Sequence, residues 1–172
     1  MNKPMKYLAI MILFTGNLPV NAGEIAASPN GIPFPANYIN WQIISSSHRT
    51  DNKTLRVIFG NDIAIKAARS GNINPWPKGA MLGKVVWKEG KDEHWTAAIV
   101  PKKFVHVEFM LKDKVKYKST GGWGYARWVG PDLKVHGKND SFANECVACH
   151  TPVKNQDYVF TKPAPLFNGK LK

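Results

Sequence analysis

The chain contains two cysteines, and both belong to one short motif near its carboxyl end. Cys146 and Cys149 are separated by two residues, and His150 follows the second cysteine directly. This C-x-x-C-H spacing allows two thiols to add across the two vinyl groups of one haem, with the histidine placed to coordinate the iron. The motif therefore predicts covalently bound haem c, with His150 as the axial metal ligand.

Other uses of the two thiols agree less well with the sequence. A thioredoxin-like C-x-x-C motif would follow a strand in a βαβ unit, and the adjacent histidine would then be accidental. A zinc site would need two further ligands at matched spacing, and the sequence holds no second C-x-x-C or H-x-x-x-H pair. A disulfide across two intervening residues would close almost no loop and would add little stability.

The amino terminus has the features of an export signal. Two lysines precede a short apolar run at residues 7–14, and Val20-Asn21-Ala22 fits a small-x-small cleavage site. We therefore expect a signal peptide over residues 1–22 and a single c-type haem domain over residues 23–172. The mature protein would be periplasmic, on the side of the membrane where haem c is attached. The alternative is an uncleaved membrane anchor, although the apolar run is too short to span a bilayer.

The sequence is strongly basic, because 24 lysines and arginines against 12 aspartates and glutamates give a formal net charge of +12. The lysines are spread along the chain and no arginine-rich tract occurs, so we expect no nucleic-acid partner. A basic surface can steer an acidic redox partner towards the protein. It can equally serve solubility alone, and the charge leaves both interpretations open.

Runs of β-branched and aromatic residues predict several strands. They are expected at residues 55–59, 84–88, 97–100, 104–111 and 123–129. The fourth run alternates regularly, with Val105, Val107, Phe109 and Leu111 facing one way and His106, Glu108 and Met110 facing the other.

Few helices are expected. One helix should follow the capping residue Asn61 and end at Gly71, and a second should begin near Ser141 or Phe142 and stop before Pro152. This pattern argues against a helical bundle. It predicts an α+β fold that is mainly antiparallel sheet, with the haem motif on a carboxyl-terminal helix.

An ordered set of motifs resembles the cytochrome P-460 family. The set runs through nearly the whole mature chain and comprises His48-Arg49-Thr50-Asp51, Thr54 to Ile58, Gly60-Asn61-Asp62, Pro75 to Ala80, Gly83 to Trp87, Gly122 to Trp128, and Cys146 to His150 followed by Val159-Phe160-Thr161. The resemblance implies a β-rich fold, commonly homodimeric. It also implies one of two classes, namely cytochromes P-460 that oxidise hydroxylamine or cytochromes c′-beta that bind nitric oxide and carbon monoxide.

The resemblance further implies roles for individual residues. Lys84 matches the lysine that is joined covalently to the haem macrocycle in cytochrome P-460, and Arg56 corresponds to an arginine of the distal pocket. The enzymatic class also has a carboxylate near the distal face, for which Glu108 and Asp140 are the candidates. Structural interpretations stand beside these: Lys84 as a solvated lysine, Arg56 as a paired structural arginine, and Glu108 as a residue facing water.

The sixth coordination position of the iron separates the functional hypotheses. A methionine ligand, either Met81 or Met110, would favour electron transfer. Without one, the position stays open to a small nitrogenous ligand or a gas. Following the resemblance, we expect five-coordinate iron bound by His150. The first hypothesis is therefore a hydroxylamine-oxidising enzyme, the second a non-catalytic gas-binding protein, and the third an electron carrier.

Overall fold

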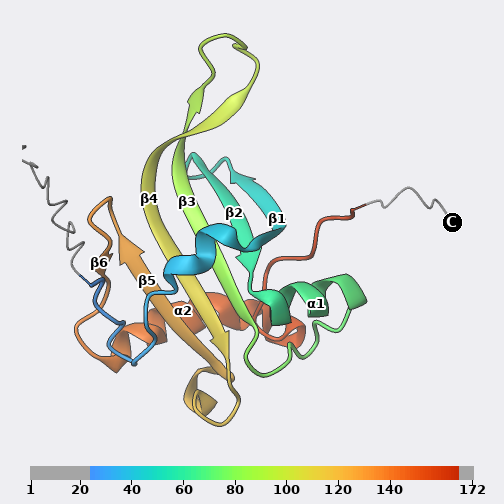
Figure 1. Cartoon of the computed structure of the whole chain (residues 1–172), viewed down its shortest axis with the longest axis vertical. Coiled ribbons are helices and arrows are strands. Elements are labelled where there is room, and N and C mark those ends of the chain that lie inside the picture. The colour runs from blue at the N-terminus through green and yellow to red at the C-terminus, as the bar shows by residue number, and fades with distance from the viewer. Residues whose placement is uncertain (1–23, 167–172) are drawn as a thin grey trace, which may run out of the picture.

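The centre of the molecule is one antiparallel sheet of six strands in sequential order (Figure 1). The computed structural model describes residues 24–166, so the expected signal peptide at residues 1–22 lies outside the described residues. The strands are β1 (Gln42–Arg49), β2 (Thr54–Gly60), β3 (Met81–Lys91), β4 (Ile99–Lys112), β5 (Trp123–Val129) and β6 (Lys134–Val135). This arrangement confirms the predicted α+β class.

The amino-terminal segment covers one face of the sheet. It includes the short 3₁₀ helix η1 (Ala36–Asn40), which crosses the strands in Figure 1. Phe109 and Trp128 are almost completely buried beneath this segment, and the ring of Phe34 packs edge-on against both of them. Buried aromatic contacts of this kind stabilise a domain well beyond their area alone. The aromatic core between the amino-terminal segment and the sheet therefore stabilises this part of the fold.

Two α-helices lie on the opposite face of the sheet, α1 (Asp62–Ser70) and α2 (Ala143–His150). The boundaries of α1 confirm the prediction. The side chain of Asn61 accepts a hydrogen bond of 3.0 Å from the backbone N–H of Ala64, and Gly71 closes the helix with a φ of 72°. The helix packs its small and branched side chains against the sheet.

The side chains of β4 alternate between the two faces as predicted. Val107 and Phe109 are buried in the core beneath the amino-terminal segment. Glu108 and Met110 lie on the face that carries α2, where Met110 packs against the core under the helices. One strand thus contributes both to the core and to the face that holds the haem motif.

β1 is missing from the strands expected from the sequence. Its residues include a run of three serines and lack the β-branched and aromatic pattern that indicates a strand. β1 lies at the edge of the sheet, is mostly exposed, and forms by backbone pairing with β2. The backbone hydrogen bonds to β2 therefore stabilise β1 as a strand, although its residues have a low intrinsic preference for strand conformation.

β3 and β4 are longer than expected and form a hairpin that extends beyond the rest of the sheet (Figure 1). The two strands expected at residues 97–100 and 104–111 are one continuous strand that includes Pro101. The pairing register shifts on either side of Trp87. Such irregularities accommodate a proline, which has no N–H to give to the ladder.

The expected carboxyl-terminal helix consists of three successive helical segments, η3 (Asp140–Phe142), α2 and η4 (Thr151–Gln156). α2 ends at His150, before Pro152 as predicted. The proline lies in the first turn of η4, where a missing N–H leaves no bond unmade. The C-x-x-C-H motif therefore lies on α2. Within residues 24–166, no helix combines the length and the apolar character needed to cross a membrane.

Candidate functional site

The C-x-x-C-H motif occupies the last turns of α2. Cys146 and Cys149 are three residues apart on the helix, so they project from neighbouring positions. Both are free thiols; Cys146 is half-buried against the core, and Cys149 is exposed. Burial raises the pKa of the Cys146 thiol to about 11. Two thiols at neighbouring positions of one helix, followed directly by a histidine, suit the attachment of a haem.

The imidazole of His150 is held in one orientation. Its Nδ1 lies 2.6 Å from the carbonyl oxygen of Tyr158, and because a carbonyl only accepts, Nδ1 carries the proton and donates. Nε2 therefore keeps its lone pair, which is the form that binds a metal. The ring packs against Tyr125 at a centroid distance of 5.4 Å and against Phe160 at 5.2 Å. Burial also lowers the pKa of His150, which favours the neutral ring.

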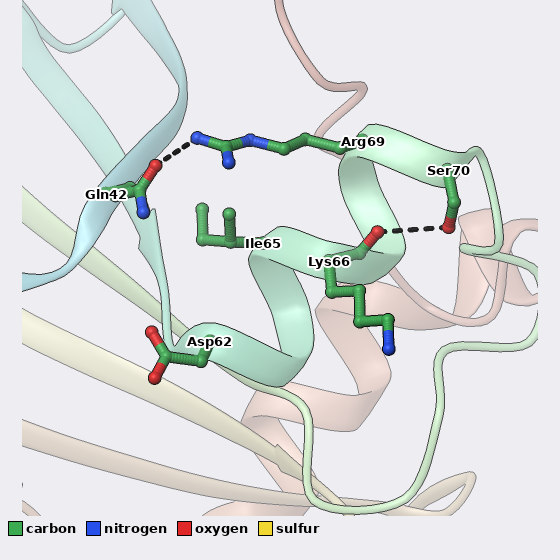
Figure 2. Close-up of a pocket in the computed structure, with 6 residues that line it drawn as sticks. All are labelled: Gln42, Asp62, Ile65, Lys66, Arg69 and Ser70. Carbon is green, nitrogen blue, oxygen red and sulfur yellow. Dashed lines mark hydrogen bonds between the residues drawn. The ribbon is translucent and has the colours of Figure 1, made fainter.

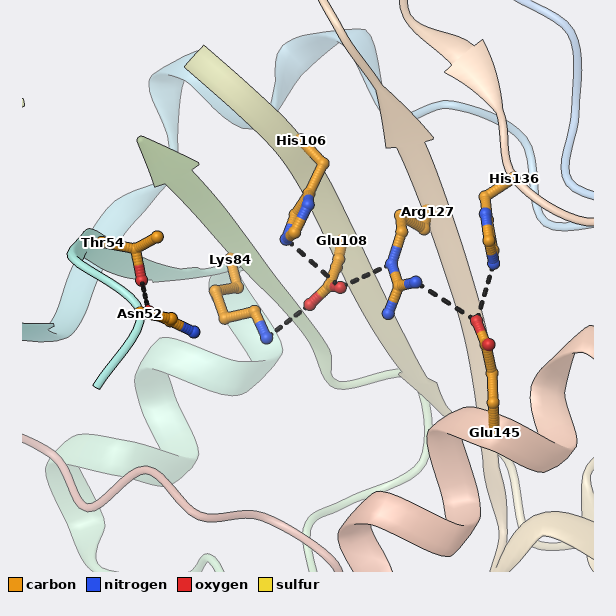
Figure 3. A network of polar contacts seen from close by, with 8 residues as sticks. All are labelled: Asn52, Thr54, Lys84, His106, Glu108, Arg127, His136 and Glu145. Carbon is orange, nitrogen blue, oxygen red and sulfur yellow. Dashed lines mark hydrogen bonds and ion pairs between the residues drawn. The ribbon is translucent and has the colours of Figure 1, made fainter. Parts of the chain in front are cut away.

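Three charged side chains cross the sheet beside α2 and form what we call the charged row (Figure 3). Lys84 on β3, Glu108 on β4 and Arg127 on β5 are register partners and share one face. Lys84 forms an ion pair with Oε2 of Glu108, and Nε of Arg127 donates to Oε1 of Glu108 at 2.6 Å. The three side chains are 30%, 17% and 27% exposed in that order, so the row is partly open to solvent.

Glu108 stays ionised because cations surround it. Burial raises the pKa of Glu108, but the charges of Lys84, Arg127 and His106 outweigh that effect and hold it at about 2. Nε2 of His106 lies 3.4 Å from Oε1 of Glu108. Burial lowers the pKa of His106, and the nearby carboxylate opposes this. His106 is therefore the better proton acceptor of the two near neutral pH, whereas Glu108 is a weak base.

The charged row continues onto the helix that carries the motif. Nη1 of Arg127 donates to Oε1 of Glu145 at 3.2 Å, and Glu145 directly precedes Cys146 on α2 (Figure 3). Burial dominates the pKa values of both Cys146 and His150, and the charge of Lys84 also acts to lower both. The row therefore lies within electrostatic reach of Cys146 and of His150.

Arg56 lies on β2, where its backbone pairs with β3 beside the row. Its Nε is buried and has no hydrogen-bond partner among the described residues. Burial lowers the pKa of Arg56, Arg49 adds to this, and Glu108 opposes it. A buried guanidinium N–H without a partner calls for an explanation, and a missing anionic ligand supplies one.

The remaining candidates from the sequence lie apart from this group. Asp140 is exposed in η3 and borders a surface hollow with Ser141, so the structure does not bring it to the charged row. Met81 packs into the core under the amino-terminal segment, on the far side of the sheet from α2. Met110 is on the same side as Cys146 and packs in the same cluster.

A hollow of about 420 Å³ lies between α1 and the start of β1 (Figure 2). It is lined by Gln42, Asp62, Ile65, Lys66, Arg69 and Ser70. Arg69 donates to the side chain of Gln42 across it, and Ser70 donates to the carbonyl of Lys66 at 3.0 Å. None of the catalytic, haem-binding or metal-binding residues predicted from the sequence lines this hollow, so it is separate from the site on α2.

Sequence reasoning did not single out Arg127, Glu145 or Tyr158. Arg127 occurs within an aromatic run, and only the register of β4 with β5 places it opposite Glu108. Tyr158 acts through its backbone carbonyl, which no side-chain pattern reveals. The alternation along β5 was the one available signal, because it places Arg127 on the same face as Tyr125.

A family model described as Cytochrome P460 matches residues 35–161, a stretch that runs from η1 through the C-x-x-C-H motif. No curated protein matches the chain. Since the matched stretch covers most of the sequence, the chain belongs to the cytochrome P460 family, and it is a haem cytochrome.

Proposed function

We propose that this member of the cytochrome P460 family is a periplasmic c-type cytochrome that oxidises hydroxylamine and passes the electrons to an acceptor. In this proposal Cys146 and Cys149 would hold one haem through thioether bonds, and His150 would bind its iron. The observation that carries the proposal is the charged row beside α2 together with the neighbouring His106 (Figure 3), because they offer ionised groups and a proton acceptor near the motif.

The residues present fit a haem. His150 offers an unprotonated Nε2, since its Nδ1 proton is bound to a carbonyl. The Nε of Arg56 and the hydroxyl of Tyr125 are buried without a hydrogen-bond partner among the described residues. A planar cofactor that carries carboxylates would give such groups partners and cover the partly exposed row.

When bound, the haem would supply an iron that binds hydroxylamine and takes up its electrons. The chain's own groups would manage charge and protons. Oxidation of hydroxylamine releases protons, and His106 would accept one, because burial lowers its pKa and leaves the ring neutral near pH 7. Glu108, 3.4 Å away and ionised, would stabilise the imidazolium that results. Arg56 would hold negative charge at the edge of the site.

Lys84 has a special place in the proposal, because it matches the lysine that is joined to the macrocycle in hydroxylamine-oxidising cytochromes. Its charge reaches both Cys146 and His150. In the enzymatic form we expect the Lys84 nitrogen to be bonded to the haem edge, held there by the surrounding strand β3. Glu108 would then lose one of its cations and become a stronger base than it is in the ion pair.

A second function is favoured by the same pair of residues. Lys84 is engaged with Glu108, and a lysine ammonium in an ion pair is not nucleophilic. If Lys84 stays free, the protein would instead bind nitric oxide or carbon monoxide at an open iron without catalysis. An electron carrier ranks third, since Met81 packs on the far side of the sheet.

The optical spectrum of the purified ferrous protein tests the proposal. A strongly red-shifted Soret band, together with turnover of hydroxylamine with an electron acceptor, supports the enzyme. An ordinary high-spin c-type spectrum without turnover supports the gas-binding protein. The associated expectations are a homodimer, tested by light scattering, and an acidic redox partner, tested by the loss of electron transfer rate at high salt.

A further inference from the structure

We propose that the ion pair between Lys112 and Asp157 is a positioning device for the axial histidine. It lies outside the charged row and the motif. It acts by fixing the carbonyl of Tyr158, which receives the Nδ1 proton of His150. The inference rests on the proposed role of His150 as the iron ligand, and it adds the residues that tune that ligand.

The pair is buried to a degree that is unusual for charged groups. The side chain of Lys112 is 1% exposed and that of Asp157 is 10% exposed, with Nζ and Oδ1 2.5 Å apart. The ammonium also lies 4.7 Å from the ring centroid of Trp123. Burying two charges costs free energy, and a hydrophobic pair would often be as stable. Stability alone therefore gives a weak account of this pair.

Asp157 is tied to three separate parts of the structure. Its Oδ1 binds Lys112 at the end of β4, and its Oδ2 accepts the backbone N–H of Trp76 at 2.8 Å. Its backbone carbonyl accepts the indole N–H of Trp123 on β5 at 2.7 Å. These bonds anchor the residue directly before Tyr158 to two strands and a loop.

The backbone at this point is strained. Asp157 has a φ of 51° and Tyr158 a φ of 63°, so two consecutive residues other than glycine adopt the left-handed conformation. Such residues persist only where their surroundings fix them. The ring of Tyr158 also packs over Gly121, where an added Cβ would lie 2.4 Å from the ring. This turn directs the carbonyl of Tyr158 at His150.

The chain of contacts thus runs from Lys112 through Asp157 and Tyr158 to His150. A hydrogen bond at Nδ1 orients the imidazole and raises its basicity as a metal ligand. Axial ligand strength and hydrogen bonding in turn set the reduction potential of a haem. Releasing Asp157 should lengthen the hydrogen bond to Tyr158 and weaken the bond between His150 and the iron. The ferric state would lose more stabilisation than the ferrous state.

The test compares Lys112→Met with the control Val107→Ala in the haem-loaded protein. Val107 is fully buried on the opposite face of the sheet, so its truncation lowers stability without touching this turn. The readouts are the iron–histidine stretching band in the Raman spectrum of the ferrous protein, and the reduction potential. We expect Lys112→Met to move the band to lower wavenumber and the potential to more positive values. Val107→Ala should leave both unchanged at a comparable loss of thermal stability.

An unmoved band in folded Lys112→Met, or an equal movement in Val107→Ala, overturns the inference. If Lys112→Met does not fold, Asp157→Asn is measured in its place. Asparagine tolerates the left-handed conformation, and its side-chain oxygen can still accept a hydrogen bond from the backbone N–H of Trp76. This variant should move the band in the same direction by a smaller amount, and no movement overturns the inference. A wild-type protein without any iron–histidine band overturns the ligand role of His150 and this inference together.

Discussion

Lys84 and Glu108 stand directly opposite each other on β3 and β4, and they form an ion pair on the sheet face that carries α2. A paired ammonium has no lone pair with which to bond a haem edge. An amine that is bonded to the macrocycle would in turn leave Glu108 with less positive charge around it. The two functional hypotheses therefore predict different states of this ion pair. In the hydroxylamine-oxidising enzyme the pair would be broken, and in the gas-binding protein it would be kept.

The first prediction is that Lys84 is bonded to the haem in the mature protein. Lys84 is the cation of the charged row whose charge reaches both Cys146 and His150. Peptide mass spectrometry after digestion should find the Lys84 peptide joined to the haem peptide of residues 146–150. Two separate peptides with an ordinary c-type spectrum would leave the gas-binding protein as the better hypothesis.

Lys84→Arg is the matched variant for this prediction. It keeps a cation next to Glu108 but cannot form the same bond. An ion pair with Glu108 should therefore form and the fold should persist, while the joined peptide and the red-shifted Soret band disappear. Lys88→Arg, on the same strand and bonded to the carbonyl of Asn52, is the control and should change neither. A red-shifted band that survives in Lys84→Arg would show that Lys84 does not cause it.

The sequence was sufficient to predict the fold class, the limits of α1 and β5, and the position of the motif on a carboxyl-terminal helix. These features depend on local signals. Capping residues, a glycine that ends a helix and regular alternation can each be recognised from residues that are close together in the sequence. β1 was missed because its serines form a strand only through pairing with β2. The long β4 was split at Pro101, since a sequence pattern does not show that a bulge can absorb a proline.

The candidate site was also predictable only in part, because some of its contacts join segments that are distant in the sequence. The C-x-x-C-H spacing is enough to predict Cys146, Cys149 and His150 as a haem-binding group, because the three residues lie close together in the chain. The partners of Glu108 come from neighbouring strands, and their identity depends on a register that no single segment encodes. The hydrogen bond from His150 to Tyr158 uses a backbone carbonyl, to which any residue type could contribute.

A second prediction concerns the attachment of the haem. Cys146 and Cys149 are free, adjacent thiols on α2, so they should carry the haem through thioether bonds. Extraction of the purified protein with acidified acetone should leave the haem on the polypeptide. In Cys146→Ala combined with Cys149→Ala, the haem should pass into the solvent. Free haem from the wild-type protein, or zinc in a metal analysis, would contradict covalent attachment.

A third prediction is that neither Met81 nor Met110 ligates the iron. Met81 packs on the far side of the sheet, and Met110 is engaged in the cluster that also holds Cys146 and Tyr158. Met81→Leu and Met110→Leu should therefore leave the ferric and ferrous spectra unchanged. If either variant converts a low-spin spectrum to a high-spin one, the protein belongs with the electron carriers.

The fourth prediction concerns the haem-free chain, in which Lys84 keeps its ion pair with Glu108. It uses the acid stability of that chain to measure the contribution of the charged row. Glu108 has a pKa of about 2 in the folded chain, against an ordinary value of 4.5. Because the folded value is the lower one, the ionised form stabilises the fold above the ordinary pKa, and this contribution is lost as the pH falls towards 2. Linkage gives a contribution of about 3 kcal/mol near neutral pH, of which about 2 kcal/mol is lost between about pH 6 and about pH 3.

Glu108→Gln isolates this contribution, since it keeps the shape of the side chain and cannot ionise. Urea unfolding should show the wild-type protein losing about 2 kcal/mol more than Glu108→Gln over the same pH interval. Glu93→Gln, an exposed position on the hairpin, should follow the wild-type curve. Equal slopes for the wild-type protein and Glu108→Gln would mean that Lys84 and Arg127 do not hold an ionised Glu108.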